Sequence, residues 1–146
     1  ILTLIENGYY IEGTDFEPNA QITQEGFLRY LYAPEQRYYG DADAFYRMLT
    51  DRGVVKAGER DADAALTRYD AAKFVVRHLG LQRIAEHPEV FVNAFNDEAA
   101  AEYGGYAAIV KALSIMRGDA AGNFNGTRIL TNAEAAVVIH NTLEAQ

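Results

Sequence analysis

The chain has 146 residues, of which 13 are Lys or Arg and 21 are Asp or Glu, so its formal net charge is −8. This acidic balance disfavours binding to nucleic acid or to anionic lipid, and the lack of Cys excludes disulfides, cysteine-ligated metals and cysteine nucleophiles. With 49% apolar residues and no uncharged apolar run near the roughly 20 residues of a membrane span, we expect one soluble domain over residues 1–146.

A short phrase occurs three times along the chain. In each copy an apolar residue precedes Thr and a polar residue, at Ile22-Thr23-Gln24, Leu66-Thr67-Arg68 and Leu130-Thr131-Asn132. A glycine lies upstream of each Thr, at Gly13, Gly58 and Gly118. This constant order predicts three units, at about residues 1–36, 37–81 and 90–146, with a longer connection near residues 81–97.

Apolar residues recur at helical spacing on both sides of the glycine in each unit, which predicts a helix, a loop and a second helix. Before the glycines, the predicted core positions are Ile1, Leu4 and Ile5, then Phe45, Met48 and Leu49, then Tyr106, Ile109, Val110 and Leu113. After the threonines they are Phe27, Tyr30 and Leu31, then Ala71, Phe74 and Val75, then Ala135, Val138 and Ile139.

The threonines are predicted helix N-caps. Thr67 and Thr131 precede Asp70 and Glu134 by three residues, which is the spacing of a capping box. Thr23 has Gly in place of that acidic partner. We expect the three glycines to hold left-handed turns where the first helix of each unit ends.

The remaining polar residues form no catalytic or metal-binding pattern. The only serine is Ser114, and 21 carboxylates make chance pairs certain, so we expect no enzyme. The Asp and Asn residues near 61–63 and 119–125 lack the spacing of a calcium-binding loop, and we expect no metal and no cofactor. We interpret Lys73 and Arg77 as a solvated helix face and His78 as a packed or boundary residue.

Several segments follow the order of a known pattern. The third unit supplies Phe95-Asn96-Asp97, Tyr103, the loop from Gly118 to Phe124, and Leu130-Thr131-Asn132-Ala133-Glu134. The first unit supplies Phe16-Glu17-Pro18-Asn19 and Ile22-Thr23-Gln24-Glu25, and the second supplies Leu66-Thr67-Arg68-Tyr69-Asp70. In these residues the chain resembles three tandem copies of the S-layer homology family.

The resemblance implies an all-α fold in which three helix-loop-helix repeats pack around a pseudo-threefold axis into a central helical bundle. It also implies a non-catalytic module that anchors a larger exported protein to the bacterial cell surface. The implied partner is a secondary cell-wall polysaccharide, including one that carries ketal-linked pyruvate, bound in grooves between neighbouring repeats. The protein would then act outside the cell.

Carried onto matching positions, the resemblance points to six glycan-binding residues: Arg68, Thr67, Gly58, Gly118, Asp97 and Tyr103. Only Arg68 keeps the basic residue that follows Thr in the family, because Gln24 and Asn132 stand at the other two positions. A guanidinium gives a carboxylate two charge-assisted hydrogen bonds, which an amide does not match. The alternative hypothesis is therefore a scaffold that has lost glycan binding and acts as a structural or protein-interaction module.

Overall fold

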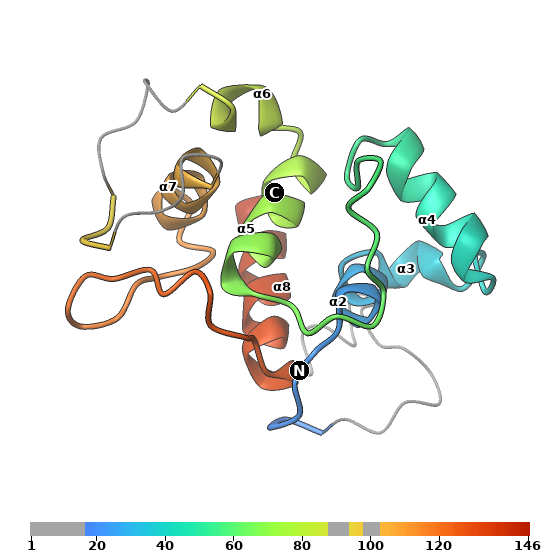
Figure 1. Cartoon of the computed structure of the whole chain (residues 1–146), viewed down its shortest axis with the longest axis horizontal. Helices are drawn as coiled ribbons and strands as arrows, with labels where there is room; N and C mark the ends of the chain where they lie inside the picture. The colour runs from blue at the N-terminus through green and yellow to red at the C-terminus, as the bar shows by residue number, and fades with distance from the viewer. Residues whose placement is uncertain (1–16, 88–93, 98–102) are drawn as a thin grey trace. The chain divides into compact units, whose positions relative to one another are not determined.

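The computed structural model describes residues 17–87, 94–97 and 103–146, which contain seven α-helices and no β-strand. The predicted all-α class is confirmed. The helices are α2 (Gln24–Leu31), α3 (Ala33–Gln36), α4 (Ala42–Asp51), α5 (Arg68–His78), α6 (Gln82–Ala85), α7 (Gly104–Ala112) and α8 (Asn132–Ala145) (Figure 1). The helix predicted around Ile1, Leu4 and Ile5 and the turn at Gly13 lie outside the described residues.

The chain forms two compact units. Unit 1 comprises Ile1–Leu66 and Leu130–His140, and unit 2 comprises Thr67–Ile129 and Asn141–Gln146. The helix α8 begins among the residues of unit 1 and ends among those of unit 2. The predicted repeat boundaries and the single domain over residues 1–146 stay predictions.

The threonine caps form as the sequence predicts. The Thr67 side chain accepts a hydrogen bond from the Asp70 backbone N–H at 3.2 Å. Thr131 and Glu134 cap each other, because each side chain accepts a hydrogen bond from the backbone N–H of the other. Thr23 caps α2 through the N–H of Gly26 and needs no acidic partner. Each cap satisfies one of the N–H groups that a helix start leaves unpaired, and is worth about 1 kcal/mol.

The three apolar residues that precede the threonines exchange backbone hydrogen bonds inside unit 1. The Ile22 N–H donates to the Leu130 carbonyl, the Leu66 N–H to the Ile22 carbonyl, and the Leu130 N–H to the Leu66 carbonyl, at 3.0–3.1 Å. All three side chains are buried. Each segment thus donates to one partner and accepts from the other, which closes a ring and brings the three phrases of the sequence together. The packing of whole repeats around a pseudo-threefold axis stays a prediction.

Unit 2 is built on α5, and α7 packs against both α5 and α6 (Figure 1). The predicted positions of α5, which are Ala71, Phe74 and Val75, are fully buried. A Cβ on Gly105 would overlap the carbonyl of Ala85, so glycine is what allows α7 to approach α6 so closely. Leu113, predicted in the core, is 39% exposed because it caps the end of α7 and no longer follows the helical period.

The solvated face predicted for Lys73 and Arg77 is wrong. Arg77 is 6% exposed and the Lys73 side chain is 12% exposed. Both residues lie on α5, which α7 covers, and their long apolar stems can be buried beside aromatic rings. The guanidinium carbon of Arg77 lies 5.9 Å from the ring centroid of Tyr106.

The glycine prediction is half correct. Gly58 has a left-handed φ of +85°, but the left-handed glycine at the end of α4 is Gly53, with a φ of +76°. Gly118 does not lie in that region. Gly118 is needed for space, because an added Cβ would lie 2.8 Å from both the Phe95 ring and the Asn123 carbonyl oxygen. The left-handed residue after α7 is Ser114, with a φ of 58°.

Candidate functional site

The start of α5 holds a loop of the same unit through its backbone. After the Thr67 cap, the Arg68 N–H donates to the Arg128 carbonyl at 3.0 Å and the Tyr69 N–H donates to the Gly126 carbonyl at 2.9 Å. These N–H groups belong to the first turn of the helix and have no partner within it. Pairing them with the loop fixes residues 126–128 against the start of α5.

The Arg68 side chain extends this attachment. Its Nε donates to the Phe124 carbonyl at 2.9 Å, and its Nη2 donates to the Arg117 carbonyl at 2.6 Å. The guanidinium carbon also lies 4.9 Å from the centroid of the Phe124 ring, within the range of a cation–π contact. The guanidinium is therefore oriented by two hydrogen bonds and an aromatic face, and it ties residues 117 and 124 to α5.

Four aromatic rings form a row beside Arg68. Tyr69 and Tyr103 stack at 4.6 Å with an interplanar angle of 10°. The ring centroids of Tyr69 and Phe124 are 5.7 Å apart, and those of Phe124 and Phe95 are 4.9 Å apart. We call Tyr103, Tyr69, Phe124 and Phe95 the aromatic row. It combines residues from α5, from the loop before α7 and from the loop before α8.

A second basic group lies next to the row. The Nζ of Lys73 pairs with Asp70 at 3.3 Å and lies 5.7 Å from the centroid of the Tyr103 ring. The Tyr103 hydroxyl donates a hydrogen bond to the same carboxylate oxygen, Asp70 Oδ1, at 3.2 Å. Asp70 therefore holds both the ammonium and the aromatic ring. Its carboxylate serves this purpose rather than the reciprocal half of a capping box.

Two aspartates shape the loop that Arg68 holds. Asp97 accepts hydrogen bonds from the backbone N–H of Phe124 and of Asn125, both at 2.8 Å, one on each oxygen. Asp119 accepts from Asn125 Nδ2 and from the backbone N–H of Ala121 and Asn123. The hydrogen bond from Asn125, followed by those from the backbone, lowers the pKa of Asp119 below its ordinary value.

Five of the six predicted site residues lie in unit 2 and meet around the segment 117–125. Thr67 caps the helix that carries Arg68, Asp97 binds the backbone next to Phe124, Gly118 gives room to Phe95, and Tyr103 ends the aromatic row. The sixth, Gly58, belongs to unit 1 and an added Cβ there would meet nothing within 4 Å.

Residues 94–136 match the family of S-layer homology domains. The match covers 43 of the 146 residues and supports an S-layer homology domain in this part of the chain. Domains of this family anchor proteins to polymers of the bacterial cell wall, at the cell surface, and are not catalytic. No curated protein matches the chain. Within the described parts of the chain, none of the helices is both long enough and apolar enough to span a bilayer.

The matched residues include Asp97, Tyr103 and Gly118, whereas Thr67 and Arg68 precede them in sequence. Both parts come together in unit 2 through the hydrogen bonds of Arg68 to residues 117 and 124. The three tandem repeats stay a prediction, because the family match covers only the third predicted unit.

Gln24 follows Thr23 in unit 1 as Arg68 follows Thr67 in unit 2. The Gln24 side chain, however, is buried in a hydrogen-bond network within unit 1. Gln24 is 6% exposed, its Nε2 donates to the Glu59 carbonyl, and its Oε1 accepts from the Tyr46 hydroxyl and from the Asp61 N–H, all at 2.8–2.9 Å. Burial is the main reason that the pKa of Tyr46 is raised to about 12. Both polar atoms of the amide thus have hydrogen-bond partners inside unit 1.

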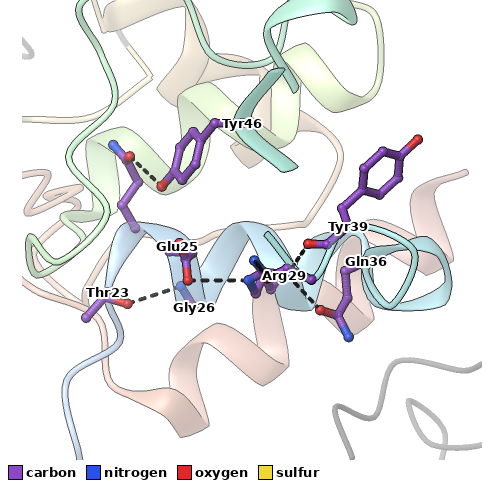
Figure 2. Close-up of polar contacts among 9 residues, drawn as sticks. Thr23, Glu25, Gly26, Arg29, Gln36, Tyr39 and Tyr46 are labelled. Carbon is purple, nitrogen blue, oxygen red and sulfur yellow. Dashed lines mark hydrogen bonds and ion pairs between the residues drawn. The ribbon is translucent and has the colours of Figure 1, made fainter. Parts of the chain in front are cut away.

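Arg29 is also internally satisfied. Figure 2 shows its guanidinium between Glu25, Gln36 and the backbone of Tyr39, with distances of 3.3, 3.0 and 3.1 Å. The guanidinium carbon lies 4.4 Å from the centroid of the Phe45 ring. At the third phrase, the Asn132 side chain donates to the Glu17 carbonyl at 2.8 Å. All three polar residues that follow the threonines thus bind backbone carbonyls.

Tyr69, Lys73 and Phe124 belong to the unit-2 site but are not among the site residues predicted from the sequence. A signal for two of them was present, because Tyr69 directly follows Arg68 and Lys73 lies on the same helix. Phe124 ends a loop that carries the family resemblance, but no local pattern places it beside Arg68, which is 56 residues away along the chain.

Proposed function

We propose that unit 2 binds an acidic polysaccharide of the bacterial cell wall and thereby anchors the protein that carries this chain. The observation that supports the proposal best is the position of two cations along the aromatic row, with Arg68 beside the Phe124 ring and Lys73 beside the Tyr103 ring. An aromatic face can stack on a sugar ring, and oriented cations can bind its carboxylate. A ketal-linked pyruvate supplies such a carboxylate.

The net charge of −8 does not oppose this proposal. At physiological salt, charges are screened over about 8 Å, so groups around the ligand decide the interaction. Arg68 also lies in the first turn of α5, where the helix dipole favours an anion. The roles of Thr67, Gly118, Asp97 and Tyr103 in glycan binding are part of the proposal, whereas Gly58 belongs to unit 1 and is not part of the unit-2 site.

A binding experiment tests this function. Wall polysaccharide with its pyruvate groups intact is compared with polysaccharide from which mild acid has removed them, by titration calorimetry with the native chain. We expect the intact polysaccharide to bind at least tenfold more tightly, because the ketal carboxylate provides charge-assisted hydrogen bonds worth about 1.5–3 kcal/mol.

Lys73→Gln is the variant of choice, because Arg68 also holds the loop and its loss would disturb the fold. We expect this variant to bind the intact polysaccharide about tenfold more weakly. Lys56→Gln, which removes the same charge from an exposed loop position in unit 1, is the control and should bind as the native chain does. If the native chain ignores both polysaccharides, or if the two variants bind alike, the proposed site is wrong.

The second candidate is a structural or protein-interaction module without glycan binding. One observation favours it, namely that Arg68, like Gln24 and Asn132, donates hydrogen bonds to backbone carbonyls of the chain itself. A native chain that binds neither polysaccharide, yet unfolds cooperatively, would support this candidate.

A further inference from the structure

A shallow depression of about 350 Å³ lies in unit 1 and shares no residue with the unit-2 site. One wall is a face of α4, formed by Ala44, Arg47, Met48 and Asp51, which are spaced as neighbours on one side of a helix. Tyr39 and Arg52 complete it. The volume is at the lower end of the range for small-molecule sites, enough for a single sugar ring.

The walls of the depression are held in place by contacts behind them. The Tyr39 carbonyl accepts a hydrogen bond from Arg29, and Figure 2 shows the Tyr39 ring pointing away from that guanidinium. Arg52 makes two hydrogen bonds to Glu35, at 2.9 and 2.7 Å, so its charge is balanced outside the depression. Met48 is buried and forms an apolar floor.

Arg47 and Asp51 differ from the other charged residues nearby. Arg29, Arg37, Arg52 and Arg60 each have a hydrogen-bond partner in unit 1. Within residues 17–87, 94–97 and 103–146, by contrast, Arg47 and Asp51 have no hydrogen bond and no ion pair from their side chains. One guanidinium and one carboxylate, one helical turn apart, thus face a depression that also has an aromatic side chain and an apolar floor.

This combination fits a sugar acid better than other small ligands. An apolar ligand needs to be enclosed over most of its surface, and this depression is open. An acidic peptide side chain would satisfy Arg47 but would bring no donors to Asp51. A sugar ring with a carboxylate offers an anion for the guanidinium, hydroxyl donors for the Asp51 carboxylate and an apolar face for Tyr39.

We infer that this depression is a carbohydrate subsite that takes one uronic acid residue, with Tyr39 against the sugar ring, Arg47 on its carboxylate and Asp51 on its hydroxyls. The subsite uses only residues of unit 1, so it goes beyond the proposed function of unit 2. It would let one chain contact a wall polymer at two places, which raises the strength of attachment without a stronger single site.

The test is an NMR titration of the ¹⁵N-labelled chain with methyl glucuronide as the probe. We expect saturable shifts of backbone amides between residues 39 and 52, with a Kd of about 1–10 mM, as is usual for one small polar ligand in an open site. Methyl glucoside, which lacks the carboxylate, and acetate, which lacks the ring, should each bind at least fivefold more weakly than the glucuronide.

Arg47→Gln removes the charge but keeps most of the stem, and it should weaken glucuronide binding about fivefold or more. Arg83→Gln removes the same charge from an exposed position of α6 in unit 2 and is the control that should bind as the native chain does. The amide spectrum of each variant reports directly whether it is folded. Asp51→Asn, which replaces a carboxylate by a weaker acceptor, should also weaken binding.

Three results would overturn the inference. The first is a titration in which the amides of residues 39–52 do not shift. The second is equal affinity for acetate and for the glucuronide, which would mean that Arg47 binds any carboxylate. The third is unchanged affinity in Arg47→Gln. Because the shifts are assigned to residues of unit 1, failure here leaves the unit-2 proposal to be decided by its own variants.

Discussion

Replacing Gln24 by Ala should destabilise the chain because three groups share its side-chain amide. The Tyr46 hydroxyl and the Asp61 N–H donate to its oxygen, and its nitrogen donates to the Glu59 carbonyl. Ala removes all three hydrogen bonds at once and leaves two donors and one acceptor without their partner.

The magnitude follows from where those three groups lie. A neutral hydrogen bond contributes about 1 kcal/mol, so the upper value is about 3 kcal/mol. Asp61 is exposed and Glu59 is partly exposed, so both backbone groups can bind water in the variant. Tyr46 is 3% exposed, so its hydroxyl gains little hydrogen bonding to water in the variant. We therefore expect a loss of about 2 kcal/mol in the free energy of unfolding, about half of it from the orphaned Tyr46 hydroxyl.

Urea unfolding of four chains measures this: the native chain, Gln24→Ala, Tyr46→Phe and the double variant. If the Tyr46 hydroxyl is the main orphaned group, Gln24→Ala should cost about 1 kcal/mol less in the Tyr46→Phe background. Gln21→Ala, at an exposed position of the same segment, should change stability by less than about 0.5 kcal/mol. A cost for Gln24→Ala no larger than that of Gln21→Ala, or no coupling to Tyr46, would refute the reasoning.

Three more outcomes are expected. The raised pKa of Tyr46 means that the unfolded chain loses the tyrosyl proton near pH 10 while the folded chain keeps it up to about 12, so stability should fall across this pH window. If the urea midpoint of Tyr46→Phe falls between pH 10 and 12 as much as that of the native chain, this expectation is wrong. Gly126→Ala would place a Cβ inside the Tyr69 ring and should cost about 1–3 kcal/mol in urea unfolding, with loss of the tyrosine near-ultraviolet circular dichroism. Asp97→Asn keeps one acceptor of two for the backbone of residues 124 and 125, and should lower the free energy of unfolding by about 1 kcal/mol; an unchanged value would show that the loop does not depend on Asp97.

Local patterns predicted the helices α2, α5 and α8 and their threonine caps, but not the short helices α3 and α6. The Thr131 to Glu134 box and the Thr67 cap depend only on residues three positions apart, and the core positions of α5 depend only on the helical period. These features require no knowledge of what packs against the helix. The same holds for the left-handed turn at Gly58.

Features that depend on distant contacts were not predictable. Arg77 and Lys73 are covered by α7, whose position over α5 no local pattern encodes. The partners of Gln24 are 22 to 37 residues away, so its buried network could not be read from the phrase that contains it. Gly118 was predicted to be needed for a left-handed turn, but it is needed because the Phe95 ring, from another loop, leaves no room for a Cβ.

The closed ring of backbone hydrogen bonds among Ile22, Leu66 and Leu130 has a consequence for how the chain acquires its structure. Two of its members are about a hundred positions apart, so the ring cannot close until nearly all of the chain is available. In a protein that emerges gradually, from a ribosome or through an export channel, the early segments would wait for the last one. A chain that ends before residue 130 would then leave the Ile22 N–H and the Leu66 carbonyl without their hydrogen-bond partners, and would not form a smaller stable domain.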